Sequence, residues 1–81
     1  MTVFVRLFGP QAVAAGTRRL AVEVPVGATA RDVRTRLGEL NAGLAPSLPY
    51  SRIALNFEFV GDDATVSEGD EVALIGMLSG G

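Results

Sequence analysis

The sequence contains no cysteine, histidine or tryptophan, and these absences exclude several classes of chemistry. Without cysteine there is no disulfide framework, thiolate nucleophile or zinc–thiolate site, so apolar packing alone must hold the fold together. Without histidine the chain lacks the commonest general base at neutral pH and cannot build a Ser-His-Asp or Cys-His constellation. We therefore expect no metal site, no bound cofactor and no independent active site.

Lysine is also missing, because all seven basic residues are arginine. This fits either a genomic codon bias or a chain that donates its own C-terminus and offers no lysine amine as an acceptor. The formal charge is −2 and the arginines are scattered, so we expect no nucleic-acid partner. Since no apolar run approaches the roughly 20 residues of a membrane helix and no leader is recognisable, we expect a cytoplasmic protein without membrane contact.

Two N-terminal segments alternate apolar and polar side chains, which predicts two strands joined through one helical turn over residues 11–15. We expect the strands to be antiparallel. One face of the pair would carry Val3, Val5, Leu7, Leu20, Val22 and Val24. The opposite face would carry Phe4, Arg6 and Phe8.

A helix is predicted to begin after Thr29, a good N-cap followed three residues later by Asp32. Apolar residues then recur at spacings of three and four, which indicates a single buried stripe. The stripe consists of Ala30, Val33, Leu37, Leu40 and Leu44. Gly38 inside this helix predicts close packing against the sheet, and residues 42–51, with two prolines, are expected to form a loop.

Further strands are predicted over residues 52–56 and 71–75, with a short apolar run at 57–60 between them. The order β-β-α-β-(β)-β predicts an α+β fold of the β-grasp type, with a mixed four- to five-stranded sheet and one main helix across one face. Residues 1–75 would form this domain. Residues 76–81 would form a flexible C-terminal tail.

Two groups of surface residues are candidates for partner contacts. Alternation places Phe4, Phe8, Ala73 and Ile75 on the face that the helix leaves open, and such apolar faces commonly mark a binding site, although single exposed apolar residues are also common on ordinary surfaces. The turns carry the acidic residues Asp62, Asp63, Glu68, Asp70 and Glu71. These form either a patch for a basic partner or a solvated surface.

The sequence ends in Ser79-Gly80-Gly81. Glycines lack a Cβ, so an extended segment of this kind can thread a narrow channel and expose its last carbonyl to another active site. A carboxylate resists nucleophiles until it is converted to a better acylating group, and an ATP-dependent partner that makes an acyl-adenylate would do this.

Three stretches together resemble the MoaD group, the small subunits of molybdopterin synthase: Ala54-Leu55-Asn56, Glu68-Gly69-Asp70-Glu71-Val72-Ala73, and Ser79-Gly80-Gly81. The chain is similar, less closely, to ThiS, the carrier for thiamine thiazole synthesis. The resemblance implies a ubiquitin-like fold and a sulfur-carrier function. Gly81 would be adenylated and then converted to a thiocarboxylate, which donates sulfur for molybdenum cofactor biosynthesis.

The resemblance also implies the partners. An adenylyltransferase of the ubiquitin-activating kind (MoaB, MoeB or ThiF type) would use ATP, a sulfur-transfer protein would supply sulfur, and the large subunit MoaE would take Met77, Leu78, Ser79 and Gly80 into its active site. By position in the family, Phe8, Phe59 and Ile75 would contact that subunit. Members often have two prolines where this chain has Gly76-Met77, so the start of the tail is expected to be looser here.

Other functions remain open at this point. The carrier could serve thiamine or another sulfur-containing metabolite, since the pathway is decided by partner surfaces. The chain could be a non-catalytic β-grasp binding module whose outer face does all the recognition, or a ubiquitin-like modifier that is attached to lysines of other proteins.

Overall fold

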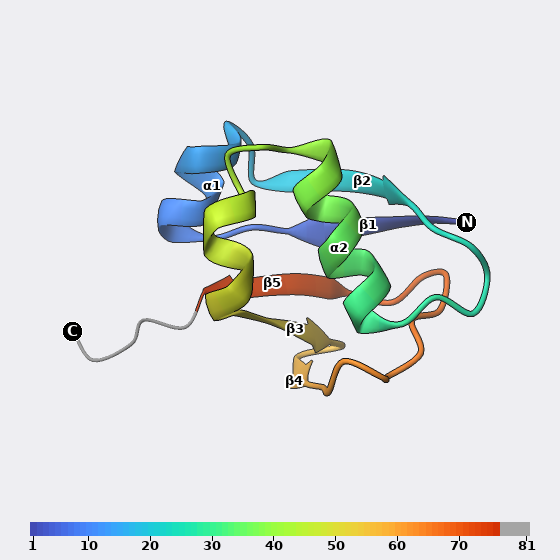
Figure 1. The fold of residues 1–81 in the computed structure, drawn as a ribbon. Helices are drawn as coiled ribbons and strands as arrows, with labels where there is room; N and C mark the ends of the chain where they lie inside the picture. The colour runs from blue at the N-terminus through green and yellow to red at the C-terminus, as the bar shows by residue number, and fades with distance from the viewer. Residues whose placement is uncertain (77–81) are drawn as a thin grey trace.

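A computed structural model describes residues 1–76, which form one five-stranded mixed sheet in the order β2-β1-β5-β3-β4 (Figure 1). The strands are β1 (Thr2–Arg6), β2 (Arg19–Glu23), β3 (Ser51–Leu55), β4 (Glu58–Phe59) and β5 (Val72–Gly76). The central strands β1 and β5 run parallel, and the remaining neighbours are antiparallel. This confirms the predicted ubiquitin-like β-grasp.

Strand β5 extends to Gly76, which the sequence analysis assigned to the tail. Gly76 lies opposite Ser51 in the β3–β5 register, so the sheet continues one residue beyond the predicted boundary. The rest of that predicted tail, residues 77–81, lies outside the described residues. We call it the C-terminal segment.

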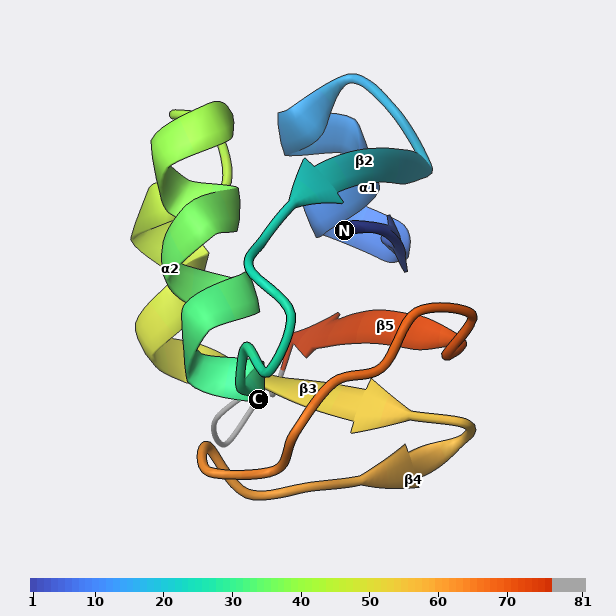
Figure 2. The same cartoon turned by 90° about the vertical axis from the view of Figure 1, so that its right-hand side faces the viewer.

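The helical elements α1 (Gly9–Ala15), α2 (Ala30–Leu40) and the 3-10 helix η1 (Ala45–Tyr50) connect the strands. Helix α2 and η1 cover one face of the sheet, and no helix among residues 1–76 covers the other (Figure 2). The predicted start of α2 is confirmed: the Thr29 hydroxyl accepts from the Asp32 N–H, and the Asp32 carboxylate accepts from the Thr29 N–H. Such a reciprocal cap satisfies two N–H groups that the helix itself leaves unpaired.

The core lies between α2 and the covered face, as the alternation predicts. Its side chains are almost completely excluded from water, and burying each valine or leucine contributes about 1.5–3 kcal/mol. The largest of them are Val3, Val5, Val22, Val33, Leu37, Leu44, Val66, Val72 and Leu74. No helix among residues 1–76 is long and apolar enough to cross a bilayer.

The predicted apolar stripe of α2 is wrong at Leu40, which is 46% exposed. The helix ends there, with Asn41 as its C-cap, so Leu40 lies on a last turn that the sheet does not cover. Leu44 is fully buried as predicted, but it reaches the core from the following turn, where its N–H donates to the Asn41 carbonyl at 3.1 Å.

The loop predicted over residues 42–51 is also wrong, because Ala45–Tyr50 forms η1. Pro46 stands in its first turn, where a missing N–H costs nothing. A Cβ on Gly38 would lie 2.8 Å from Leu48 Cδ1, so α2 does pack closely at Gly38. The contact is with η1, however, and not with the sheet as expected.

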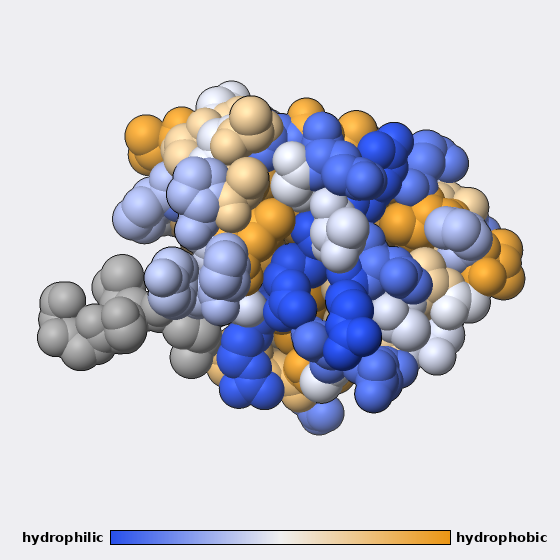
Figure 3. Space-filling model, viewed as in Figure 1, coloured by the Kyte–Doolittle hydropathy of each residue, from blue (hydrophilic) through white to orange (hydrophobic). Residues whose placement is uncertain are grey.

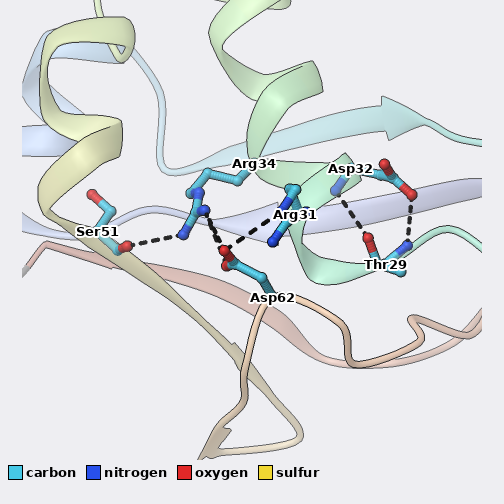
Figure 4. A network of polar contacts seen from close by, with 6 residues as sticks. All are labelled: Thr29, Arg31, Asp32, Arg34, Ser51 and Asp62. Atoms are coloured by element: carbon cyan, nitrogen blue, oxygen red, sulfur yellow. Dashed lines mark hydrogen bonds and ion pairs between the residues drawn. The ribbon is translucent and has the colours of Figure 1, made fainter.

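Asp62 joins the turn after β4 to helix α2 (Figure 4). Its carboxylate lies 3.0 Å from Arg34 Nη2 and 3.6 Å from Arg31 Nε. Asp70, in turn, accepts hydrogen bonds from the Ser67 N–H within its own turn and from Asn56 Nδ2 of the connection between β3 and β4. These two members of the predicted acidic patch therefore bind neighbouring groups of their own chain.

Candidate functional site

The three predicted contact residues Phe8, Phe59 and Ile75 come together around a hollow on the open face of the sheet. This outer-face hollow has a volume of about 250 Å³. Its lining residues are Arg6, Phe8, Ala54, Phe57, Phe59, Glu71, Val72, Ala73 and Ile75. The family resemblance and the alternation of side chains thus indicated residues that the fold brings together.

The floor of the outer-face hollow follows from strand register. Ala73 of β5 lies between Arg6 of β1 and Ala54 of β3, and Ala54 lies beside Phe59 of β4. In this cross-strand row two small side chains stand between two large ones, so the centre of the row is low and its ends are high. The hollow can take up an apolar side chain of a partner.

The other walls come from chain segments that leave the sheet. Phe8 is the N-cap of α1 and keeps an extended backbone, with φ −134° and ψ 155°, before the helix begins. Ile75 is the penultimate residue of β5 and pairs with Arg52 of β3. These residues place one wall next to Gly76, the last described residue before the C-terminal segment.

The hairpin between β3 and β4 presents a fourth apolar residue. Asn56 and Phe57 both have left-handed backbones, with φ values of 52° and 71°, as two-residue hairpin turns require. The turn is anchored to the start of β5, because the Asn56 N–H donates to the Glu71 carbonyl at 2.8 Å and the Glu71 N–H donates to Asn56 Oδ1 at 3.1 Å. Phe57 is left 86% exposed at the rim of the outer-face hollow.

Arginine side chains stand beside the aromatic rings on this face. The Arg52 guanidinium lies 4.9 Å from the ring centre of Phe59, and the Arg19 guanidinium lies 4.1 Å from that of Phe4. Such contacts hold rings in place without covering them completely. The opposite surface, over α2, is mainly hydrophilic (Figure 3). An apolar hollow with basic neighbours therefore distinguishes the open face.

Not every outward residue joins the outer-face hollow. Phe4 lines a separate and more polar groove of about 560 Å³ together with Arg19, Glu68, Asp70 and other residues. Sequence reasoning placed Phe4 on the correct face but could not separate the two depressions. It also missed Ala54 and Phe57, since cross-strand neighbours and turn conformation depend on pairing between distant segments.

The residues that would carry the chemistry, Gly81 with Met77, Leu78, Ser79 and Gly80, lie outside the described residues. Within residues 1–76 no group of three or more acidic side chains is arranged to hold a metal ion. The described part of the chain offers a surface for recognition, and that surface borders the end of β5.

Solved structures of other proteins share this fold. SAMP1 from Haloferax volcanii, a small archaeal modifier protein, is 26% identical over the full length of both chains, with a TM-score of 0.86. A putative molybdopterin converting factor, subunit 1, from Pyrococcus furiosus has 22% identity over 96% of this chain and 99% of its own, with a TM-score of 0.84.

A third structure contains a partner. It is the complex of subunits 1 and 2 of the molybdopterin-converting factor from Helicobacter pylori, with 24% identity over the full length of both matched chains and a TM-score of 0.69. In sequence, residues 5–81 match the ThiS family. This match includes every strand of the sheet, at least in part, and all the predicted site residues. The chain therefore belongs to the ThiS family of ubiquitin-like sulfur carriers.

Proposed function

We propose that this chain carries sulfur as a thiocarboxylate on Gly81 and acts as the small subunit of molybdopterin synthase. The observation that carries the proposal is the outer-face hollow, which lies beside the end of β5 in a chain whose match to the ThiS family runs on through Gly81. A partner that binds this hollow would receive the C-terminal segment from the adjoining strand.

The chemistry takes place in two transfers. An activating enzyme joins a Gly81 carboxylate oxygen to the α-phosphorus of ATP and releases pyrophosphate. A sulfur nucleophile from a sulfur-transfer protein then attacks the acyl carbon and expels AMP. Where the nucleophile is a persulfide, the product is an acyl disulfide; a thiol then cleaves its S–S bond, forms a disulfide with the sulfur-transfer protein and leaves a thiocarboxylate on Gly81. The thiocarboxylate sulfur then bonds to a carbon of the molybdopterin precursor and displaces an oxygen leaving group, and water hydrolyses the resulting thioester, which leaves the sulfur on the product and returns the Gly81 carboxylate for another cycle.

The outer-face hollow has a defined role in this proposal. An apolar side chain of the large subunit would insert over Ala54 and Ala73 and exclude water from the surrounding rings. Central apolar contacts of this kind commonly dominate interface energies. The activating enzyme would use the same face at a different step, so the two partners would bind in turn.

Intact mass provides the first test. Incubation with a ThiF-type activating enzyme, ATP and a sulfur source should add about 16 mass units, the exchange of one oxygen for sulfur. Removal of Gly81 should abolish the gain and leave the fold intact, because terminal residues rarely hold a core together. An unchanged mass, in a reaction that sulfurates a known carrier of this family, would refute the proposal.

The pathway is tested separately. The sulfurated chain is combined with a molybdopterin synthase large subunit and the precursor of molybdopterin, and dithiolene formation is followed together with loss of the added mass. Product formation supports the molybdopterin assignment. If the thiocarboxylate forms but sulfur passes only to a thiazole synthase, the carrier serves thiamine synthesis.

The similarity to SAMP1 favours a second candidate, a protein modifier. In that case the activated Gly81 acyl group would pass to a lysine amine of another protein, forming an amide and releasing AMP or a thiol. Peptides that carry a Gly-Gly remnant on lysine would identify this activity. Sulfuration without such remnants would support the carrier function and count against the modifier function.

A further inference from the structure

Helix α1 is anchored in the domain by a polar residue. Gln11 is the only residue of this helix that is buried, with 6% of its surface exposed. Its Nε2 atom has two hydrogen-bond partners, but its Oε1 atom accepts no hydrogen bond from residues 1–76. A half-satisfied buried amide stabilises a fold less well than an apolar side chain of similar size. Stability alone therefore does not explain a glutamine at this position.

Two serines fix the orientation of the Gln11 amide. Gln11 Nε2 donates to Ser47 Oγ of η1 at 2.9 Å and to Ser51 Oγ of β3 at 2.7 Å. The single proton of each hydroxyl is already used, since Ser47 Oγ donates to the Leu44 carbonyl and Ser51 Oγ donates to the Ser47 carbonyl. Both hydroxyls therefore accept from Gln11, and its NH₂ group must face them. An apolar side chain would fill the same space without this directional requirement.

The same amide lies against the end of β5. A Cβ on Gly76 would lie 3.2 Å from Oε1 and 3.3 Å from Cδ of Gln11, so the glycine permits this close approach. Gly76 also pairs with Ser51 in the β3–β5 register. Gln11 is therefore held where the start of β3 and the end of β5 meet, and Figure 1 shows α1 and η1 at that end of the sheet.

The elements that meet at Gln11 also carry one side of the outer-face hollow. Phe8, the N-cap of α1, lies three residues before Gln11, and its carbonyl accepts from the Gln11 N–H at 3.2 Å. Ile75 directly precedes Gly76 in β5. Both Phe8 and Ile75 line the hollow. The rotation of α1 about its own axis therefore decides where the Phe8 ring stands relative to Ile75.

We propose that Gln11 is a positioning residue for the outer-face hollow: its directional hydrogen bonds to Ser47 and Ser51 fix the rotation of α1 and so hold Phe8 in place relative to Ile75. The value of this arrangement rests on the proposed function, in which a partner binds the hollow. A wall that is already in place before the partner arrives lowers the entropic cost of binding.

NMR of the free full-length chain tests this coupling without any partner. Gln11→Met keeps the side chain long and removes its hydrogen bonds, so the ring resonances of Phe8 should shift. Those of Phe59, which lines the same hollow from β4, should stay in place. Val13→Met is the matched control, because it puts the same residue on the exposed side of α1, and it should leave the Phe8 ring resonances in place. Unshifted Phe8 resonances in folded Gln11→Met would overturn the proposal.

Ser51→Ala keeps the test decisive where Gln11→Met does not fold. The substitution removes the acceptor of the shorter hydrogen bond and leaves the glutamine in place. The Phe8 ring resonances should shift in the same direction as in Gln11→Met, by a smaller amount. If Ser51→Ala leaves them unchanged, the hydrogen bonds of Gln11 do not set the position of α1.

Binding to a molybdopterin synthase large subunit then tests the role. Gln11→Met should weaken association about 2- to 13-fold, the change that one net hydrogen bond supplies. In the Phe8→Ala background the same substitution should have no further effect, because the residue that Gln11 positions is gone. A merely structural role would weaken binding equally in both backgrounds, and that result would overturn the proposal.

The two proposals fail separately. If the wild-type chain does not bind the large subunit, the proposed function loses its partner, while shifted Phe8 resonances in the free Gln11→Met chain still support the positioning of α1. If the wild-type chain binds and the Phe8 resonances of Gln11→Met stay in place, the positioning role alone is refuted.

Discussion

The two faces of the sheet differ in what covers them, although the same strands supply both. Leu74 and Ile75 are neighbours in β5, yet Leu74 is completely buried beneath α2 and Ile75 forms a wall of the outer-face hollow. The covered face consists of branched residues packed side by side. The open face instead places two alanines in the middle of a row that ends in Arg6 and Phe59.

This difference indicates that stability and recognition reside on separate faces of the same strands. Filling space on the covered face excludes water and holds the layers together. Leaving space on the open face keeps a site for another molecule, at the cost of exposed apolar surface. Substitutions at adjacent positions should therefore affect different properties.

The largest effect is expected from Leu74→Ala. The substitution removes a fully buried side chain from the core and should lower the free energy of unfolding by about 2–5 kcal/mol. Ile75→Ala, one residue away, should lower the free energy of unfolding clearly less, because the Ile75 side chain is only partly buried. Urea denaturation of both variants measures the difference. Equal losses would show that the open face also carries the stability of the fold.

The next effect concerns binding. Ala73→Leu fills the floor of the outer-face hollow and should weaken association with the large subunit at least tenfold, about 1.4 kcal/mol or more. Ala21→Leu, an exposed alanine of β2 that does not line the hollow, is the control and should bind normally. Calorimetric titration gives both affinities. Unimpaired binding by Ala73→Leu would mean that the partner contacts another surface.

Phe57→Gly should change stability and partner binding in opposite directions. A left-handed backbone costs an L-residue about 1–2 kcal/mol, and glycine avoids this cost. The free energy of unfolding of the variant should therefore rise by about 1 kcal/mol. Loss of the exposed ring should at the same time weaken partner binding. Thermal unfolding and titration of one sample test both points. A less stable variant would show that Phe57 packs usefully against its own chain.

The smallest effect is expected at the polar contact between α2 and the turn after β4. Arg34→Gln removes one partner of Asp62 at a partly exposed position, and such pairs contribute at most about 1 kcal/mol. The decrease in the free energy of unfolding caused by Arg34→Gln should be smaller still in 0.5 M salt, where charges are screened. A loss as large as that of Leu74→Ala would mean that charges, rather than apolar packing, join the two layers.

Local patterns in the sequence predicted much of the fold. The alternation through Val3 and Val5 and the cap at Thr29 act within a few residues, so they can be recognised without knowing the fold. The exposure of Leu40 and the 3-10 helix η1 were not predicted, because they depend on where α2 ends and on what packs against it. The burial of Gln11 was missed for the same reason: Ser47 and Ser51, its hydrogen-bond partners, are distant in sequence.

The residues of the candidate site divide in the same way: local patterns predicted some of them, and the others depend on contacts between distant segments. Phe8 and Ile75 were assigned to the open face from alternation, and Phe59 came from family position. The alanine floor was not predicted, since Ala54 and Ala73 become neighbours only through the β3–β5 register. Small residues within strands carry no signal of their own, and only the pairing of strands shows that they form the floor of the hollow.

The central position of β5 has a consequence for how the protein is made. β5 joins β1 to β3 in the middle of the sheet, so a nascent chain that lacks residues 72–76 leaves both halves with unpaired edges. Such intermediates do not complete a core and are open to proteolysis and aggregation. Translation that stops early therefore yields molecules that cellular quality control can remove, and every stably folded copy has been synthesised up to the strand that leads into Met77.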